Sequence, residues 1–352
     1  MGAMGPATSR ADPQSMEGRR HRRATVLAGL LVVALTTAWC LTRLGGRARV
    51  QDGTDVETVL VAAVAAAGCL RAALRAGREV RRFWVLMTVA LTCWVLAEGM
   101  WGFYEVVLDR PVPTPGWDDV GYLAAVPFAV AALVAHPSRH ERGLDRGRTV
   151  LDGVAAAAAV GLVGWVAVLD RVWSSNAMGT MGGLVTVAYP LTDVVMVVVL
   201  VVTLMRAGRD NRWALAGVLA GLLLMSVSDA FYAWAVQVGG YQSGDVVDVG
   251  WIAGYLAIAA AAWGDQEATD SPVAARRRGR HLRDGQPSVV PAVAPYVPVL
   301  VALTVTAASA DHLDRVSWWL AVTLVALVLA RNAMAWLDQA RGTALPVTGG
   351  AR

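Results

Sequence analysis

Five carboxylic acids stand within or at the ends of long apolar runs, where acids are rare: Glu98, Asp119, Asp193, Asp229 and Asp248. An ionised side chain at the centre of a membrane-spanning helix costs roughly 2.5–3.5 kcal/mol on insertion scales, so such acids normally face protein or a water-filled cavity. No arginine stands at matching depth in these runs to neutralise them. Because several carboxylates in one low-dielectric site cannot all stay ionised, the pattern predicts a site that holds protons or binds a cation.

Aromatic residues follow four of these acids at helical spacing. Each stands three residues after its acid, in the pairs Glu98–Trp101, Asp119–Tyr122, Asp229–Tyr232 and Asp248–Trp251. Residues three apart share a helix face, and an aromatic face attracts an organic ammonium ion. The five acids and four aromatics are therefore the predicted ligand-binding residues. Glu105, which follows Glu98 by seven residues, is expected on the same face.

A structural role is the alternative for the same residues. Acids and tyrosines can hydrogen-bond helices together, worth about 1 kcal/mol each. Tryptophan and tyrosine near helix ends also anchor helices at the membrane interface. Asp118, Asp119 and Asp248 stand near helix starts, where they could cap the helix or interact with its dipole.

The acids belong to two similar helical hairpins, residues 83–136 and 213–263. When the hairpins are aligned, the matched pairs are Glu98 and Asp229, Trp101 and Tyr232, Asp119 and Asp248, Gly121 and Gly250, and Tyr122 and Trp251. The second hairpin begins four predicted spans after the first, so both run in the same direction. The alignment predicts a parallel internal repeat, unlike the inverted repeat of many secondary transporters.

Composition places these hairpins in a membrane protein. The chain of 352 residues is 56% hydrophobic and 16% charged, whereas soluble domains carry about 25% charged residues. Runs near the ~20 residues needed to cross a bilayer recur along it. They predict an all-α integral membrane fold of about ten spans, at 24–42, 56–74, 83–104, 117–136, 149–169, 183–205, 213–237, 246–263, 290–309 and 316–336.

Arginines concentrate in alternate loops, around residues 71–82, 139–148, 206–212 and 276–283. Positively charged loops stay in the cytoplasm, so both termini are predicted to be cytoplasmic and the acids to lie toward the outside. The predicted organisation is a disordered Arg-rich tail, a bundle, a cytoplasmic linker, two last spans and a short cytoplasmic tail. Their bounds are 1–23, 24–264, 265–289, 290–336 and 337–352.

Motifs of catalysis are not found in the sequence. It contains no phosphate-binding G-x-x-x-x-G-K-[ST] loop, no H-E-x-x-H and no G-x-S-x-G, so no enzyme activity and no cofactor are predicted. Its three cysteines stand in apolar runs without the C-x-x-C spacing of a metal site, so no metal is predicted either. The net charge of +4 comes from arginines spread over loops and one tail, which does not indicate nucleic-acid binding.

Five motifs carry a resemblance to a known family. They are E-x-x-W-x-x-Y-E (Glu98 to Glu105), P-x-P-x-W-x-D-V-x-Y-L (Pro113 to Leu123), R-x-x-L-D-G (Arg148 to Gly153), A-Y-P-L-x-D (Ala188 to Asp193) and S-D-x-x-Y (Ser228 to Tyr232). Together they resemble the N-terminal multi-helix membrane region of actinobacterial diguanylate cyclases and phosphodiesterases, the GGDEF and GGDEF–EAL signalling proteins. In that family a cytoplasmic catalytic domain follows the last span. Here only residues 337–352 follow it, and no GGDEF or EAL motif occurs.

The resemblance therefore implies a sensor-like module that has lost its output domain or signals through a separate partner. We expect a multi-pass sensory protein of the cell (plasma) membrane, whose outward-facing acidic–aromatic pocket binds a proton, a cation or a small cationic ligand. The expected partners are the lipid bilayer, a separate cytoplasmic signalling protein and a second copy of the chain. The alternative is a proton- or cation-coupled transporter, because intramembrane acids also serve proton relays.

Overall fold

The computed structural model describes residues 13–136, most of 151–166, and 181–206, 212–237, 239–269, 296–309 and 313–343. Within these ranges every regular element is a helix. The elements are α1 (Pro13–Thr42), α2 (Arg47–Arg75), α3 (Arg78–Gly102), the π-helical turn η1 (Phe103–Val107), α4 (Trp117–Ala135), α7 (Met181–Arg206), α8 (Arg212–Gln237), α9 (Asp248–Thr269), α12 (Tyr296–Ala308) and α13 (Arg315–Thr343).

Seven helical segments are long and apolar enough to cross a membrane: Arg22–Thr42, Arg47–Arg75, Val80–Val107, Trp117–Ala135, Met181–Leu200, Trp213–Val236 and Arg315–Leu337. The prediction of an all-α fold with membrane-spanning helices is confirmed at this level. Of the other three predicted spans, 246–263 corresponds to α9 and 290–309 only to the short α12. The remaining one, 149–169, is described only in part, so the count of ten stays a prediction.

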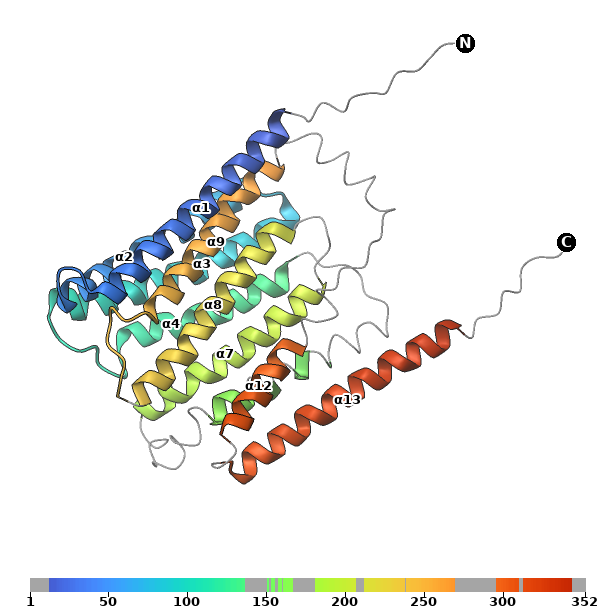
Figure 1. The fold of residues 1–352 in the computed structure, drawn as a ribbon. Coiled ribbons are helices and arrows are strands. Elements are labelled where there is room, and N and C mark those ends of the chain that lie inside the picture. Colours follow the sequence, from blue (N-terminus) through green and yellow to red (C-terminus); the bar gives the residue numbers. More distant parts are fainter. Residues whose placement is uncertain are drawn as a thin grey trace, which may run out of the picture.

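Helices α1 to α4 and α7 to α9 pack side by side as one bundle (Figure 1). The hairpin partners α3 and α4 contact each other along their length, and so do α8 and α9. Helix α9 also packs against α1 and α2, which come from the other end of the sequence. Its side chains Ile252, Tyr255 and Ile258 are completely buried. Since neighbouring helices cover α9, it does not need the strongly apolar composition of a lipid-facing span.

Glycines allow the hairpin helices to approach closely. A Cβ atom on Gly221 of α8 would lie 2.6 Å from the backbone oxygen of Gly254 of α9. A Cβ on Gly121 would lie 2.9 Å from the Cβ of Ala97, and one on Gly250 would overlap the Ser228 hydroxyl. Small residues at such contacts are how membrane helices gain close packing.

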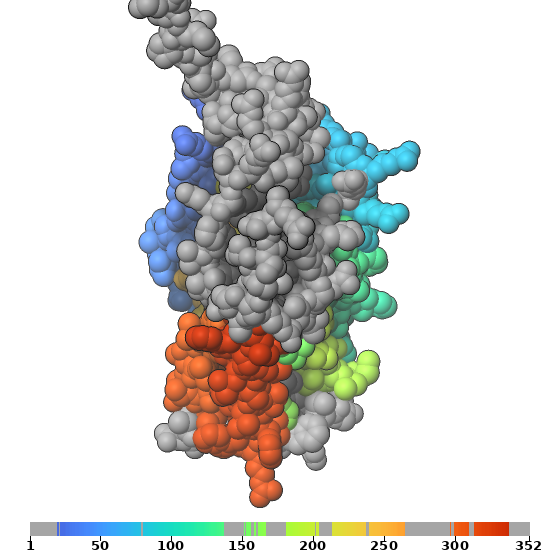
Figure 2. All heavy atoms as spheres, turned by 90° about the vertical axis from the view of Figure 1, so that its right-hand side faces the viewer, coloured from blue at the N-terminus to red at the C-terminus, as the bar shows by residue number. Residues whose placement is uncertain are grey.

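A second, smaller core joins α12, α13 and residues 155–162. It contains Ala155, Ala159, Leu162, Val299, Ala302 and Leu324. In the space-filling view α12 and α13 form an orange-to-red block at one edge of the molecule (Figure 2). Only 6% of the apolar stretch of α13 is buried against other parts of the protein, as expected for a helix that faces lipid.

Asp314 caps the start of α13 outside the apolar stretch. Its Oδ1 accepts a hydrogen bond from the backbone N–H of Ser317 (2.8 Å) and another from the Ser317 hydroxyl (2.5 Å). Trp165 donates its indole N–H to the same carboxylate at 3.2 Å. Burial alone would raise the pKa of Asp314, but these hydrogen bonds outweigh it and lower the pKa below its ordinary value.

Two helix boundaries differ from the prediction. Helix α2 begins at Arg47, well before the predicted start at 56, because the chain turns at Gly45 and Gly46. Both glycines have φ values near +90°, a conformation that other residues rarely adopt. Helix α1 begins at Pro13, inside the segment predicted as a tail. The predicted linker 265–289 lies mostly outside the described residues.

Candidate functional site

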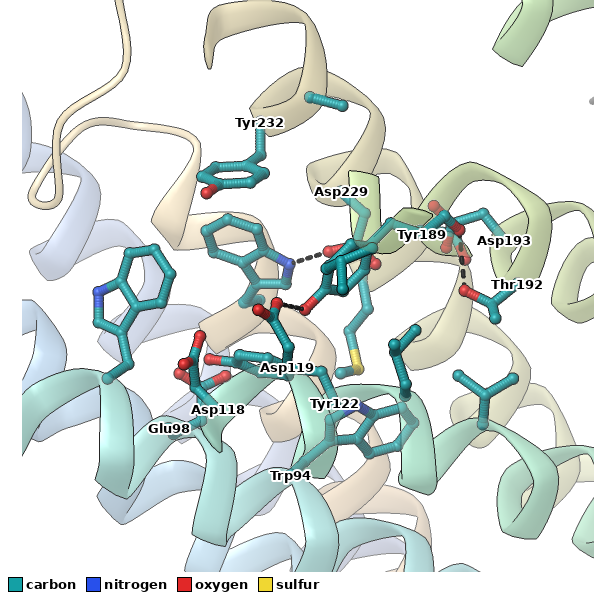
Figure 3. Close-up of a pocket in the computed structure, with 18 of the residues that line it drawn as sticks. Trp94, Glu98, Asp118, Asp119, Tyr122, Tyr189, Thr192, Asp193, Asp229 and Tyr232 are labelled. Atoms are coloured by element: carbon teal, nitrogen blue, oxygen red, sulfur yellow. Dashed lines mark hydrogen bonds between the residues drawn. The ribbon is translucent and has the colours of Figure 1, made fainter. Parts of the chain in front are cut away.

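A cavity of about 220 Å³ lies at the end of the bundle where α3 and α8 end and α4 and α9 begin. Side chains of α2, α3, α4, α7, α8 and α9 line it, and Figure 3 shows part of the lining. The structure brings together all nine predicted ligand-binding residues around this cavity: Glu98, Trp101, Asp119, Tyr122, Asp193, Asp229, Tyr232, Asp248 and Trp251. That they bind a ligand stays a prediction.

Glu98 lies between the two hairpins. The hydroxyl of Tyr255, a fully buried residue of α9, donates a hydrogen bond to Glu98 Oε1 at 2.9 Å. Tyr122 of α4 lies close to the same carboxyl group. One acid of α3 thus lies near phenols from both hairpins, and it accepts a hydrogen bond from Tyr255.

Asp229 of α8 accepts a hydrogen bond from the indole N–H of Trp251 at 2.8 Å, drawn as a dashed line in Figure 3. The carboxyl group of Asp193, halfway along α7, contacts the carboxyl group of Asp229. Two carboxylates in contact repel each other, so one of them must carry a proton or both must share a cation. The Asp193–Asp229 pair is therefore the clearest place in the cavity for a proton.

Asp119 and Asp248 have matching surroundings at the starts of α4 and α9. Asp119 accepts the backbone N–H of Gly116 at 2.8 Å and the hydroxyl of Tyr189 at 2.6 Å. Asp248 accepts the backbone N–H of Gly244 at 2.6 Å and the hydroxyl of Tyr241 at 3.0 Å. The capping role considered as the structural alternative is thus present for Asp119, which bonds to the N-cap residue Gly116, whereas Asp248 bonds to a loop residue before α9 begins.

Tyr241 lies in the connection between α8 and α9. Burial, followed by the nearby carboxylate of Asp248, raises the pKa of the Tyr241 phenol well above its ordinary value. Its hydroxyl therefore stays protonated and donates to Asp248 throughout the physiological pH range.

The aromatic wall of the cavity is centred on Tyr232. Its ring centroid lies 6.3 Å from that of Trp101, 4.7 Å from that of Tyr241 and 5.8 Å from that of Trp251, all in edge-to-face geometry. The indole N–H of Trp101 points to the hydroxyl of Ser243 at 3.4 Å. These edge-to-face contacts fix the orientation of the rings in the cavity wall.

Sequence reasoning left several lining residues out of the site. They are Asp55, Asp118, Tyr189, Tyr241 and Tyr255. Asp55 was missed because α2 was predicted to begin one residue after it. Asp118 is considered in the sequence only as an acid near a helix start that could cap the helix. Tyr189 and Tyr255 bond to acids of other helices, and Tyr241 lies in the connection before α9; spacing within one helix reveals neither relation.

Glu105 does not lie where the i, i+7 spacing from Glu98 places it, and the cavity lining does not include it. It falls in the π-helical turn η1, which has more residues per turn than an α-helix and so rotates Glu105 away from Glu98. Its carboxylate instead accepts a hydrogen bond from Gln51 Nε2 of α2 at 3.1 Å. It also contacts the carboxyl group of Asp55.

No arginine, lysine or histidine is among the described residues that line the cavity. The ion pairs at this end of the bundle, from Arg43 and Arg47 to Asp245, are exposed and span 4.0 and 3.5 Å. The lining acids are thus stabilised by neutral donors, namely phenols, an indole and backbone N–H groups. Neutral donors do not cancel negative charge, so the site can take up a proton or a cation.

Comparison of the sequence with family models, with curated proteins and with solved structures finds no match.

Proposed function

We propose that this protein is a sensory module of the cell membrane whose cavity binds a proton, a cation or a small cationic ligand from outside. One observation supports it most strongly: acids from six helices line one cavity, and no basic residue is among its described lining. The helices are α2, α3, α4, α7, α8 and α9. In this proposal about ten helices cross the membrane, both termini are cytoplasmic and the cavity opens outward. The resemblance to membrane regions of GGDEF proteins points to the same role.

The cavity lies between two hairpins that make equivalent contacts. Tyr122 lies close to Glu98 within the first hairpin, and the aligned Trp251 bonds to the aligned Asp229 within the second. The aligned Gly121 and Gly250 both abut the residue that precedes the aligned acid, Ala97 or Ser228. These correspondences support the parallel internal repeat. A guest between the hairpins would change how one packs against the other.

Such a guest biases the helix arrangement only by its differential affinity for two arrangements. In the proposed mechanism the guest replaces the protons that acid pairs hold in its absence. The resulting shift of α8 and α9 against α3 and α4 reaches the opposite end of the bundle. A separate cytoplasmic signalling protein reads that shift there, and a second copy of the chain completes the assembly.

Proton linkage tests the proposal. If the folded cavity holds protons that the unfolded chain releases, the free energy of unfolding falls as pH rises. We expect Glu98→Gln and Asp229→Asn to flatten the dependence of the melting temperature on pH in detergent. Asp52→Asn, an exposed position of α2, is the matched control and keeps the wild-type profile. An unchanged profile in both cavity variants would favour the structural alternative.

One observation favours a second candidate, proton- or cation-coupled transport. Asp193 stands halfway along α7 and contacts Asp229, so a proton site extends toward the middle of the bundle. Membrane-embedded acids serve such relays in transporters. Reconstitution into liposomes separates the two candidates: proton or cation flux that Asp193→Asn abolishes would establish transport, and sealed liposomes without flux would leave the sensory function.

A further inference from the structure

Two carboxylate oxygens in the cavity wall have no hydrogen-bond partner among the described residues. They are Asp55 Oδ2, on α2, and Asp118 Oδ1, in the first turn of α4. The carboxyl group of Asp55 also contacts that of Glu105, which is not a donor of the N–H type. Asp55 is 9% exposed and Asp118 is 2% exposed, so water in the surrounding solvent does not reach them freely. Leaving a buried polar atom unpaired costs about 1–3 kcal/mol. Glu98, Asp119, Asp229 and Asp248 already accept phenol, indole or backbone donors, whereas these two buried oxygens accept none from the described residues.

These two acids come from different helices, α2 and α4, that line the same cavity. Asp118 projects from the layer that carries Glu98 and Tyr122, opposite the layer that carries Tyr232 and Asp229 (Figure 3). Asp55 comes from α2, where it faces the end of α3 near Gly102. The aromatic cluster around Tyr232 lines the space with them.

The size of the cavity limits its guest. Drug-sized ligands occupy pockets of roughly 300–1,000 Å³, so about 220 Å³ admits a smaller organic molecule. A bare inorganic ion would leave most of the space to water, since one water takes about 30 Å³. Among the described residues no group of three or more His, Cys, Asp or Glu side chains is arranged to hold a metal ion. The aromatic lining instead suits an organic body.

The type of cation follows from the unpaired oxygens. They can accept hydrogen bonds from N–H donors, which a primary ammonium group supplies in three directions and a quaternary ammonium group cannot supply at all. Resting on the proposed cation-binding function, we propose that the cavity binds a small alkyl diammonium ion. One ammonium group donates to Asp118, the other donates to Asp55, and the alkyl chain lies against the rings of Trp101 and Tyr232.

Thermal unfolding and titration calorimetry of the full chain in nanodiscs test this. The probes are the straight-chain diamines from diaminopropane to diaminohexane, with butylamine and tetramethylammonium as comparisons. We expect at least one diamine to raise the melting temperature in proportion to the logarithm of its concentration and to bind more tightly than butylamine. Asp55→Asn and Asp118→Asn should each weaken its binding at least about tenfold, the worth of one charged hydrogen bond.

Matched controls are Asp52→Asn, on the same helix as Asp55, and Asp109→Asn, in the connection before Asp118. Both positions are exposed, and asparagine tolerates the positive φ of Asp109. Unchanged diamine affinity in the controls supports the assignment. The inference is overturned if no diamine binds, if butylamine or tetramethylammonium binds equally well, or if both cavity variants keep wild-type affinity.

The two proposals can fail separately. If no diamine binds, yet Glu98→Gln and Asp229→Asn still flatten the pH profile, the diammonium ligand is wrong and the titratable cavity stands. If no diamine binds and the two variants also keep the wild-type pH profile, the diammonium ligand and the proposed cation-binding function are both wrong.

Discussion

The hydrogen bond from Tyr255 to Glu98 joins α9 of one hairpin to α3 of the other, and its removal should loosen the two together. In Tyr255→Phe the ring remains and only the donor is lost. Because Tyr255 is completely buried, no outside water can replace its hydroxyl. We therefore expect a coupling energy between Tyr255→Phe and Glu98→Gln in a double-mutant cycle.

The expected size of this coupling follows from the geometry. The donor–acceptor distance is 2.9 Å, and hydrogen bonds to charged acceptors contribute about 1.5–3 kcal/mol in proteins. Between membrane helices, measured cycles average about 0.6 and reach about 1.7 kcal/mol. Since Tyr122 also lies close to Glu98 and remains there in the Tyr255 variant, we expect about 1 kcal/mol, between the two membrane values.

Reversible unfolding in mixed detergent micelles measures the four free energies of the cycle. Tyr104→Phe paired with Glu98→Gln is the control, because Tyr104 packs on Phe103 and is not part of the cavity lining. That control pair should couple by less than about 0.3 kcal/mol, the usual limit of additivity for separate sites.

A Tyr255–Glu98 coupling as small as that of the control pair would refute the reasoning. It would mean that the two hairpins are not joined through this carboxyl group. The proposed route by which a guest in the cavity moves one hairpin against the other would then lose its best-defined link.

Three further predictions concern packing, a helix cap and a surface charge. Gly221→Ala should lower the free energy of unfolding by about 1–3 kcal/mol, because the added methyl group overpacks against α9. Gly99→Ala, where a Cβ meets nothing within 4 Å, should be neutral or stabilising by up to about 1 kcal/mol. Chemical unfolding measures both free energies. Asp314→Ala should cost about 1 kcal/mol as a lost cap. Because the pKa of Asp314 is lowered, this contribution is present above the unfolded pKa and lost as pH falls, so the difference from wild type should shrink in acid. Arg47→Gln breaks an exposed ion pair with Asp245 and should change stability by less than about 1 kcal/mol, an effect that salt titration would erase.

Much of the site could be predicted because intramembrane acids are scarce. Each acid in an apolar run must avoid lipid, so helices that carry one acid each tend to turn those faces toward a common interior. That physical constraint brought Asp193 of α7 beside Asp229 of α8. The three-residue spacing predicted which residues share a helix face but not which residues bond to each other. Trp251 bonds to Asp229 on the neighbouring helix instead of to Asp248 on its own helix.

The missed residues depended on features that apolar runs do not record. Asp55 was assigned to a loop because hydrophobicity begins after it, although the helix begins earlier at the turn through Gly45 and Gly46. Glu105 was placed on the wrong face because spacing arguments assume 3.6 residues per turn, and η1 departs from that value. A helix start set by glycine and a π-helical turn are both local backbone features, and they decide which carboxylates reach the cavity.

The nature of the donors supports the proposal that this site exchanges protons for a guest instead of being a fixed cross-link. An arginine beside each acid would satisfy both its charge and its hydrogen bonds, and the bundle would gain nothing by admitting a cation. Phenol, indole and backbone donors satisfy the hydrogen bonds of Glu98, Asp119, Asp229 and Asp248 but leave their charge uncompensated. The remaining charge must be neutralised by protons or by a guest, and each choice places different demands on the positions of Asp55 and Asp118. Since those two acids come from different helices, exchange of protons for a guest with two positive ends would draw α2 and α4 toward a common centre.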